Sequence, residues 1–170
     1  MEKPISNFFL VLLVMSAAVW IYSSSMKNYQ SGKLLKLGTI EYVQDLNEIA
    51  ERDTYRSIAM HSLIALMSYP AVLLAAIGYV ITTPRSFKKH GWLLMCAILL
   101  FAFIPVEVYC FWLDWKIVGL NYWGNWPLEE FRKAFLIRLT ALAGLPFIAQ
   151  LCYYTIPILI IFKPLQKQEE

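Results

Sequence analysis

The stretch WLLMCAILLFAFIPVEVYCFWL, residues 92–113, decides the fold class of this chain, because Glu107 is its only charged residue. An α-helix rises about 1.5 Å per residue and the hydrocarbon core of a bilayer is about 30 Å thick. The stretch is therefore long enough to cross a membrane as one helix. Lys88 and Lys89 precede it and Asp114 follows it, so charge returns at both ends.

Three more apolar runs of comparable length accompany this one, at residues 5–25, 58–83 and 135–162. Hydrophobic residues make up 59% of the 170-residue chain and charged residues only 16%, which is typical of membrane proteins. Four spans leave no room for a separate soluble domain. The sequence therefore predicts an all-α integral membrane protein, a single membrane domain over residues 1–170 that forms an antiparallel bundle of four transmembrane helices.

The distribution of basic residues predicts the orientation of the chain. Four spans place both termini on one side of the membrane, together with the short connection that carries Arg85, Lys88 and Lys89 and no acid. Lys and Arg are enriched in cytoplasmic loops. We therefore expect a multi-pass protein with cytoplasmic N- and C-termini.

The first outer loop contains a pattern typical of an amphipathic helix. After Thr39, a plausible N-cap, apolar residues recur every three positions at Ile40, Val43, Leu46 and Ile49. Such a helix either lies on the membrane surface or extends the second span outward through Arg56. The first arrangement suits docking of a partner, and the second is a solvated lead-in to the span.

Tryptophans gather near the predicted outer surface, at Trp112, Trp115, Trp123 and Trp126. Tryptophan is enriched where a membrane meets water, so we interpret this group as an interfacial aromatic belt in contact with lipids. A platform on which a ligand stacks is the alternative.

Ionisable residues from three predicted spans fall in one outer layer. Helical rise alone puts Glu107 about 7 Å and Asp114 about 18 Å outward from the centre of the third span, on one face of that helix. The same arithmetic puts His61 about 13 Å outward in the second span and Arg138 about 16 Å outward in the fourth. The sequence thus predicts an intramembrane polar cluster of His61, Glu107, Asp114 and Arg138.

Two interpretations of this cluster are open. An ionisable residue inside a span costs roughly 2.5 to 3.5 kcal/mol, so Glu107 needs a partner. In the structural interpretation Arg138 or His61 pairs with Glu107 and locks the helices together. In the functional interpretation Glu107 and His61 carry protons or bind a quinone headgroup.

Other chemistry finds little support in the sequence. The three cysteines form no CxxC motif and the two histidines, His61 and His90, fall at opposite membrane faces, so they cannot share one haem iron. There is no serine-elbow motif, no metal-site motif, no cofactor motif and no basic stripe for nucleic acid. The apolar runs contain Pro70, Pro105 and Pro146 near their middles, and each proline can kink its helix.

The function expected from these features is that of a small non-catalytic, structural or accessory subunit of a larger membrane complex, energy-converting or transporting. Its expected partners are lipids and other membrane subunits. A membrane redox protein that binds a quinone or transfers protons through Glu107 and His61 is the alternative. An oligomeric transporter or channel is a third.

Overall fold

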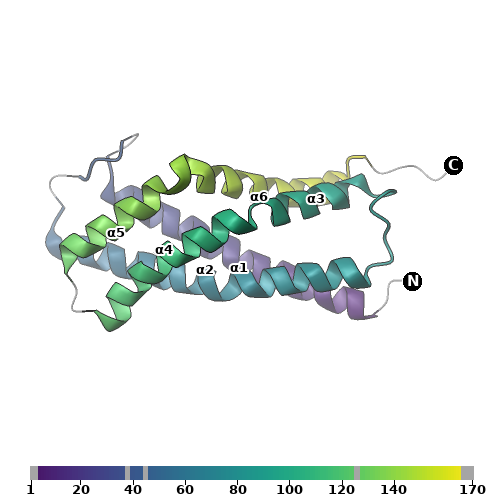
Figure 1. The fold of residues 1–170 in the computed structure, drawn as a ribbon, viewed down its shortest axis with the longest axis horizontal. Coiled ribbons are helices and arrows are strands. Elements are labelled where there is room, and N and C mark those ends of the chain that lie inside the picture. Colours follow the sequence, from purple (N-terminus) through teal and green to yellow (C-terminus); the bar gives the residue numbers. More distant parts are fainter. Residues whose placement is uncertain (1–3, 37–38, 44–45, 125–126, 166–170) are drawn as a thin grey trace. The chain divides into compact units, whose positions relative to one another are not determined.

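The chain is all-helical in the computed structural model, with no β-strand among the residues that the structure describes (Figure 1). Those residues are 4–36, 39–43, 46–124 and 127–165. Four helical stretches in them are long and apolar enough to cross a membrane, which confirms the four apolar helices predicted from the sequence. The stretches are Pro4–Leu34, Glu48–Thr82, Gly91–Trp123 and Leu128–Phe162.

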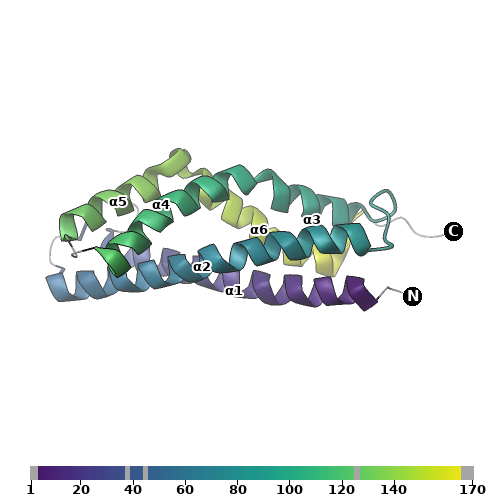
Figure 2. The same ribbon diagram turned by 60° about the horizontal axis from the view of Figure 1, so that its bottom comes forward.

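The first two stretches are single helices that lie side by side, α1 (Pro4–Leu34) and α2 (Glu48–Thr82) (Figures 1 and 2). Both continue well past the apolar runs predicted at 5–25 and 58–83. Asn47 is the N-cap of α2, since its side chain accepts a hydrogen bond from the Ile49 N–H at 3.1 Å. An N-cap of this kind satisfies one of the backbone donors left open at a helix start.

The amphipathic helix expected to begin at Thr39 is absent from the described residues of the first loop, where that prediction was wrong. Instead, Leu35 and Tyr42 form an isolated antiparallel bridge, and the Val43 N–H donates to the Leu34 carbonyl at 3.1 Å. The chain therefore turns back onto the end of α1, and its Val43 N–H satisfies a carbonyl that has no partner within the helix. The other expected arrangement, an outward extension of the second span, is observed from Glu48 onward.

The third stretch is interrupted at its centre, as the proline there predicted. It consists of α3 (Gly91–Ala102) and α4 (Ile104–Trp123), with Phe103 between them. Pro105 has no N–H to donate to the Phe101 carbonyl, and its ring crowds that carbonyl. The regular helix therefore ends one turn before the proline and begins again beside it.

The fourth stretch is also broken. It consists of α5 (Leu128–Thr140), the 3-10 turn η1 (Ala141–Gly144) and α6 (Leu145–Phe162). Within η1, Leu142 and Ala143 have φ angles of 51° and 50°, in the left-handed region that side chains with a Cβ rarely adopt. The break is therefore a true interruption of the α-helical backbone.

Proline explains this break as well. Pro146 lies in the first turn of α6, a position where its missing N–H costs nothing, whereas the ring would clash with a helical turn before it. Pro70 behaves differently, because α2 continues through it as helix. Of the three expected kinks, two are interruptions of the helix and the third is not.

The chain divides into two compact units. Unit 1 comprises Met1–Thr83 and Phe111–Arg138, and unit 2 comprises Pro84–Cys110 and Leu139–Glu170. In unit 2, α3 packs on α6, the rings of Phe103 and Tyr153 meet at 6.1 Å, and the Gly91 N–H donates to the Leu165 carbonyl at 3.3 Å. The single membrane domain predicted from the sequence stays a prediction.

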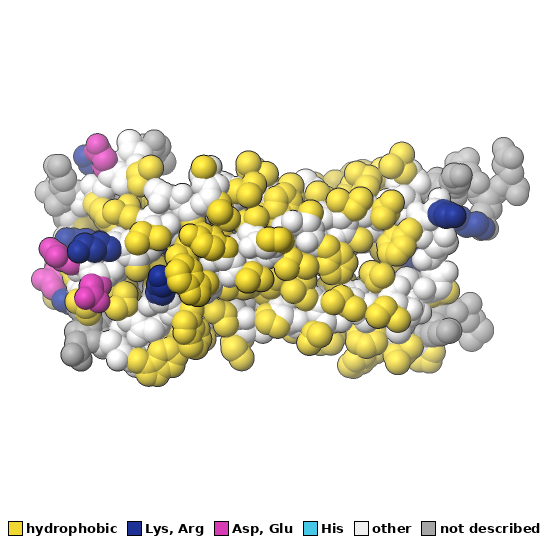
Figure 3. Space-filling view, in the orientation of Figure 1, with side chains coloured by type: hydrophobic (Ala, Val, Ile, Leu, Met, Phe, Trp, Pro, Cys, Tyr) yellow, Lys and Arg dark blue, Asp and Glu magenta, His cyan; other side chains and the backbone are white. Residues whose placement is uncertain are grey.

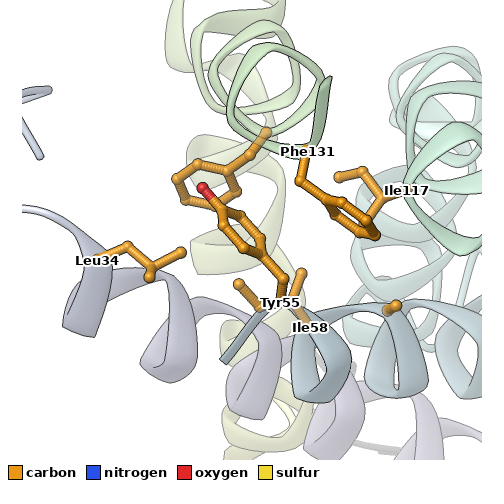
Figure 4. Close-up of a cluster of buried hydrophobic side chains, with 7 residues drawn as sticks. Leu34, Tyr55, Ile58, Ile117 and Phe131 are labelled. Atoms are coloured by element: carbon orange, nitrogen blue, oxygen red, sulfur yellow. The ribbon is translucent and has the colours of Figure 1, made fainter. Parts of the chain in front are cut away.

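Unit 1 contains an aromatic core near the two long loops (Figure 4). Tyr55 lies at its centre, with ring centroids 5.4 Å from Phe131 and 5.8 Å from Phe135. Residues of α1, α2, α4 and α5 all contribute. The members of this aromatic core are Leu34, Tyr55, Ile58, Ala59, Ile117, Phe131 and Phe135. Burial of each large side chain contributes roughly 1.5 to 3 kcal/mol, so this core explains why the helices continue beyond their apolar runs.

Large apolar side chains also cover much of the outside of the helices. The face drawn in Figure 3 is apolar along its middle, with charged side chains gathered near the ends of the helices. Exposed examples from four helices are Phe8, Met67, Leu74, Ile98 and Ile161. A protein surrounded by water rarely leaves contiguous apolar surface of this extent.

Candidate functional site

Asp114 is completely buried in unit 1 and is held by two cations from other helices. Lys27 Nζ on α1 donates to Asp114 Oδ2 at 2.6 Å. Arg138 Nε on α5 donates to Asp114 Oδ1 at 2.8 Å. Lys27, Asp114 and Arg138 form what we call the ion cluster, which ties α1, α4 and α5 together.

Each member of the ion cluster lies at an edge of an apolar run. Lys27 follows the run 5–25 by two positions, Asp114 directly follows the run 92–113, and Arg138 lies in the first turn of the run 135–162. The helices continue as helix through all three positions. The three charges therefore meet where the apolar parts of three helices give way to their polar extensions.

Burial makes the ion pairs in this cluster mutually dependent. The side chains of Lys27, Asp114 and Arg138 are 10%, 0% and 18% exposed, so little solvent screens them. A buried carboxylate is expensive unless it is paired and hydrogen-bonded, and here each oxygen of Asp114 has its own charged donor. Removal of one partner from such a group leaves a buried charge uncompensated.

A second ion pair lies beside the aromatic core. The Arg132 guanidinium donates from Nε and Nη2 to the two oxygens of Glu51, at 2.7 and 2.6 Å, in a bidentate arrangement. Glu51 is buried whereas Arg132 remains partly exposed. The Tyr42 hydroxyl lies 2.9 Å from that of Tyr55 and donates to the Arg132 carbonyl at 3.2 Å. Burial raises the pKa of Tyr42, which anchors the first loop on α2 and α5 as a neutral phenol.

The four residues of the predicted polar cluster have different surroundings. Asp114 and Arg138 are paired directly. His61 is buried on α2, its ring centroid is 6.2 Å from that of Tyr22, and its Nδ1 has no hydrogen-bond partner among the described residues. Glu107 lies half-buried in the first turn of α4, in unit 2, whereas the other three belong to unit 1.

Sequence reasoning missed Lys27 as a member of the site. Arg138 donates to Asp114 through Nε, and the pairing of Glu107 with Arg138 or His61 stays a prediction. The predicted apolar run ends at residue 25, two positions before Lys27. The structure continues α1 to Leu34 and places Lys27 on the same side as Ser23, four positions earlier and also buried. The sequence after residue 25 carries no strong signal for this, since it contains Asn28, Ser31 and Gly32.

A further feature of unit 1 is an exposed aromatic face on α4. Its side chains are between 48% and 69% exposed, and Lys116 Nζ lies over the Trp112 ring at 3.7 Å. The rings of Trp115 and Trp123 meet at 5.3 Å. We call this set the α4 aromatic face, which comprises Trp112, Trp115, Tyr122 and Trp123. Trp126, also predicted for the aromatic belt, lies outside the described residues.

Within the described ranges, no group of three or more His, Cys, Asp or Glu residues is placed to hold a metal ion. No family model, curated protein or solved structure matches this chain.

Proposed function

We propose that this chain is an integral membrane protein, a four-helix antiparallel bundle with cytoplasmic termini, that serves as a non-catalytic subunit of a larger membrane complex. The observation that carries the proposal is the exposed α4 aromatic face, three of whose four members, Trp115, Tyr122 and Trp123, lie on the part of α4 beyond the apolar run. Membrane insertion is supported by the four long apolar helices and by the large apolar side chains on their outer surfaces.

The length of the α4 aromatic face supports a protein partner in addition to lipid. Trp112 and Trp123 are separated by about 16 Å of helical rise, whereas each headgroup layer of a bilayer is only about 5 to 8 Å thick. Lipid headgroups therefore cover one end of this face, at Trp112 and Trp115. The other end, at Tyr122 and Trp123, extends beyond the headgroup layer, and a protein partner would bury these side chains.

Trp123 is the strongest point of this argument. It is 69% exposed and lies nine residues beyond Asp114, about 13 Å farther along the helix. Tryptophan and tyrosine are the residues most enriched at the centres of protein interfaces. We therefore assign Tyr122 and Trp123 to contact with another subunit, and the apolar surfaces below them to lipid or to neighbouring membrane helices.

Mild-detergent purification of the tagged protein from its native membrane, followed by mass spectrometry, tests this proposal. The Tyr122→Ser, Trp123→Ser double variant should lose a stoichiometric partner that the parent protein retains. Tyr29→Ser is the matched control, because Tyr29 is an exposed aromatic residue (62%) just past the first apolar run. A parent protein that purifies alone, or equal loss of partner from both variants, would overturn the subunit assignment.

One observation favours the alternative of proton transfer or quinone binding, namely the buried Nδ1 of His61. A buried imidazole nitrogen normally has a hydrogen-bond partner, and a quinone oxygen would supply one. Extraction of the purified protein with organic solvent and chromatography for quinones checks this alternative. It requires a quinone in the parent protein and its loss from His61→Leu; a quinone-free parent protein counts against it.

A further inference from the structure

The start of α3 and the chain that follows α6 are joined in unit 2. The Gly91 N–H donates to the Leu165 carbonyl at 3.3 Å, and a Cβ added at Gly91 would lie 2.8 Å from the Leu165 Cβ. The chain leaves α6 at Lys163, whose φ of 45° lies in the left-handed region. Two segments that are distant in the sequence therefore form one surface at this end of unit 2.

Both segments carry exposed basic side chains. Lys88 and Lys89 are exposed and lie just before Gly91. Lys163 is exposed and lies just before Leu165. Figure 3 shows Lys and Arg side chains at the end of the molecule where α3 begins and α6 ends in Figure 1. We call this set the basic end of unit 2, which comprises Arg85, Lys88, Lys89 and Lys163.

The basic end of unit 2 has a positive net charge. In the sequence, residues 84–91 and 163–170 together contain five basic and two acidic residues. Among the residues that the structure describes in unit 2, Glu107 is the one acid, and about 24 Å of helical rise separates it from the start of α3. In unit 1, by contrast, exposed acids such as Glu129 and Glu130 lie in the same helix as exposed Lys133.

The basic end of unit 2 directly adjoins three apolar runs in the sequence. Arg85 follows the run 58–83, Lys89 precedes the run 92–113, and Lys163 follows the run 135–162. When these runs cross a bilayer, basic residues so close to their ends lie at the level of the lipid headgroups. A group of four or more basic residues beside membrane helices attracts anionic lipids.

We propose that the basic end of unit 2 binds the headgroups of anionic phospholipids, with Lys88 and Lys163 as contacts from the two joined segments. Exposed ammonium groups reach the headgroup phosphates at the membrane surface, so the contact is made on an open surface. This inference rests on the membrane insertion proposed above, but not on the assignment of the chain as a subunit.

The test measures lipid binding to the purified, full-length protein. Phosphatidylglycerol, or neutral phosphatidylcholine in a separate series, is titrated into the protein in a neutral detergent, and native mass spectrometry counts the bound lipids. We expect tighter binding of phosphatidylglycerol. Its binding should weaken between about 0.1 M and about 1 M ammonium acetate, because the Debye length falls from about 10 Å to about 3 Å.

Substitutions at the two lysines test both segments of the surface. Lys88→Gln and Lys163→Gln should each weaken phosphatidylglycerol binding about fivefold, and the double variant about 30-fold, which is the contribution of one or two lysines near an anionic surface. The Lys33→Gln, Lys133→Gln double variant is the matched control, because it removes two exposed lysines from unit 1. The control should bind phosphatidylglycerol as the parent protein does.

The proposal is overturned if the parent protein binds the two lipids equally, or if the double variant and its control bind phosphatidylglycerol equally. Parent-like binding by Lys163→Gln would also overturn it, because both segments must contribute. Incorporation of the parent protein into nanodiscs tests membrane insertion separately. A protein that does not incorporate counts against the proposed function, whereas one that incorporates without preference for phosphatidylglycerol counts against this inference alone.

Discussion

Lys27 and Asp114 lie 87 positions apart in the sequence and are joined by a buried ion pair of 2.6 Å. The pair brings the end of the first apolar run to the end of the third, inside one compact unit. Because Arg138 occupies the other oxygen of Asp114, one carboxylate holds three helices. Stability of unit 1 should therefore depend strongly on this single acid.

Replacement of Asp114 should be among the most damaging single changes in unit 1. Asp114→Asn leaves two buried cations without their anion, and we expect a loss of about 3 to 5 kcal/mol in the free energy of unfolding. Chemical unfolding of the protein in detergent, followed by circular dichroism, measures this loss. Asp53→Asn removes an exposed ion pair to Arg56 and should change stability by less than about 1 kcal/mol. Equal effects of the two changes would refute a structural role for the ion cluster.

The second ion pair should show the same contrast between a buried and an exposed acid. Arg132→Leu leaves Glu51, whose side chain is 3% exposed, without its bidentate partner. Since Arg132 itself is partly in solvent, we expect a cost of about 2 kcal/mol, below that of a fully buried pair. Arg52→Leu, which disrupts the exposed pair with Glu48, is the control and should cost less than about 1 kcal/mol. A larger effect at Arg52 would contradict this assignment.

The aromatic core should stabilise the polar extensions of the helices. Phe131→Ala removes a fully buried ring that packs on Tyr55, and we expect a loss of about 3 to 5 kcal/mol. Phe162→Ala removes a ring that is 77% exposed, and its effect on unfolding in detergent should be within about 0.5 kcal/mol. Limited proteolysis gives a second readout, because loss of this core should expose sites near residues 46–57. Unchanged proteolysis and stability in Phe131→Ala would show that the extensions do not need the core.

Close packing between α1 and α2 gives a test of their contact. A Cβ added at Gly78 would lie 2.5 Å from ring atoms of Phe9, so Gly78→Ala requires that ring to move. At Gly32 nothing lies within 4 Å, and Gly32→Ala should stabilise α1 by about 0.5 to 1 kcal/mol through helix propensity. We expect Gly78→Ala to be less stable than Gly32→Ala.

A double variant separates the clash from other effects. In the Phe9→Ala background the ring is gone, so Gly78→Ala should recover the benefit of a better helix former. Thermal unfolding of the four members of this cycle gives the coupling between the two positions. Additive effects would mean that Phe9 and Gly78 do not meet as described.

The candidate site was predictable only in part. A lone acid in an apolar run is rare, which singles out Glu107 in the sequence. This rarity does not identify the residue with which Glu107 pairs. Asp114 and Arg138 were placed at similar depth by helical rise, and the structure pairs them. Lys27 was missed because a hydropathy window ends a span at the first polar residues, although the helix continues to Leu34.

The sequence by itself determined four apolar helices, because chain length and hydropathy act locally. It also marked three central prolines as kink sites, but which of them interrupt the helix, Pro105 and Pro146 and not Pro70, came from the structure. The aromatic core around Tyr55 and the choice of Lys27 as a partner of Asp114 were decided only by tertiary structure. Their physical reason is the same in each case. A buried charge or ring is stabilised by side chains that are distant in the sequence. Helical spacing predicts the depth of a residue and its face of the helix, but not which residue of another helix it contacts.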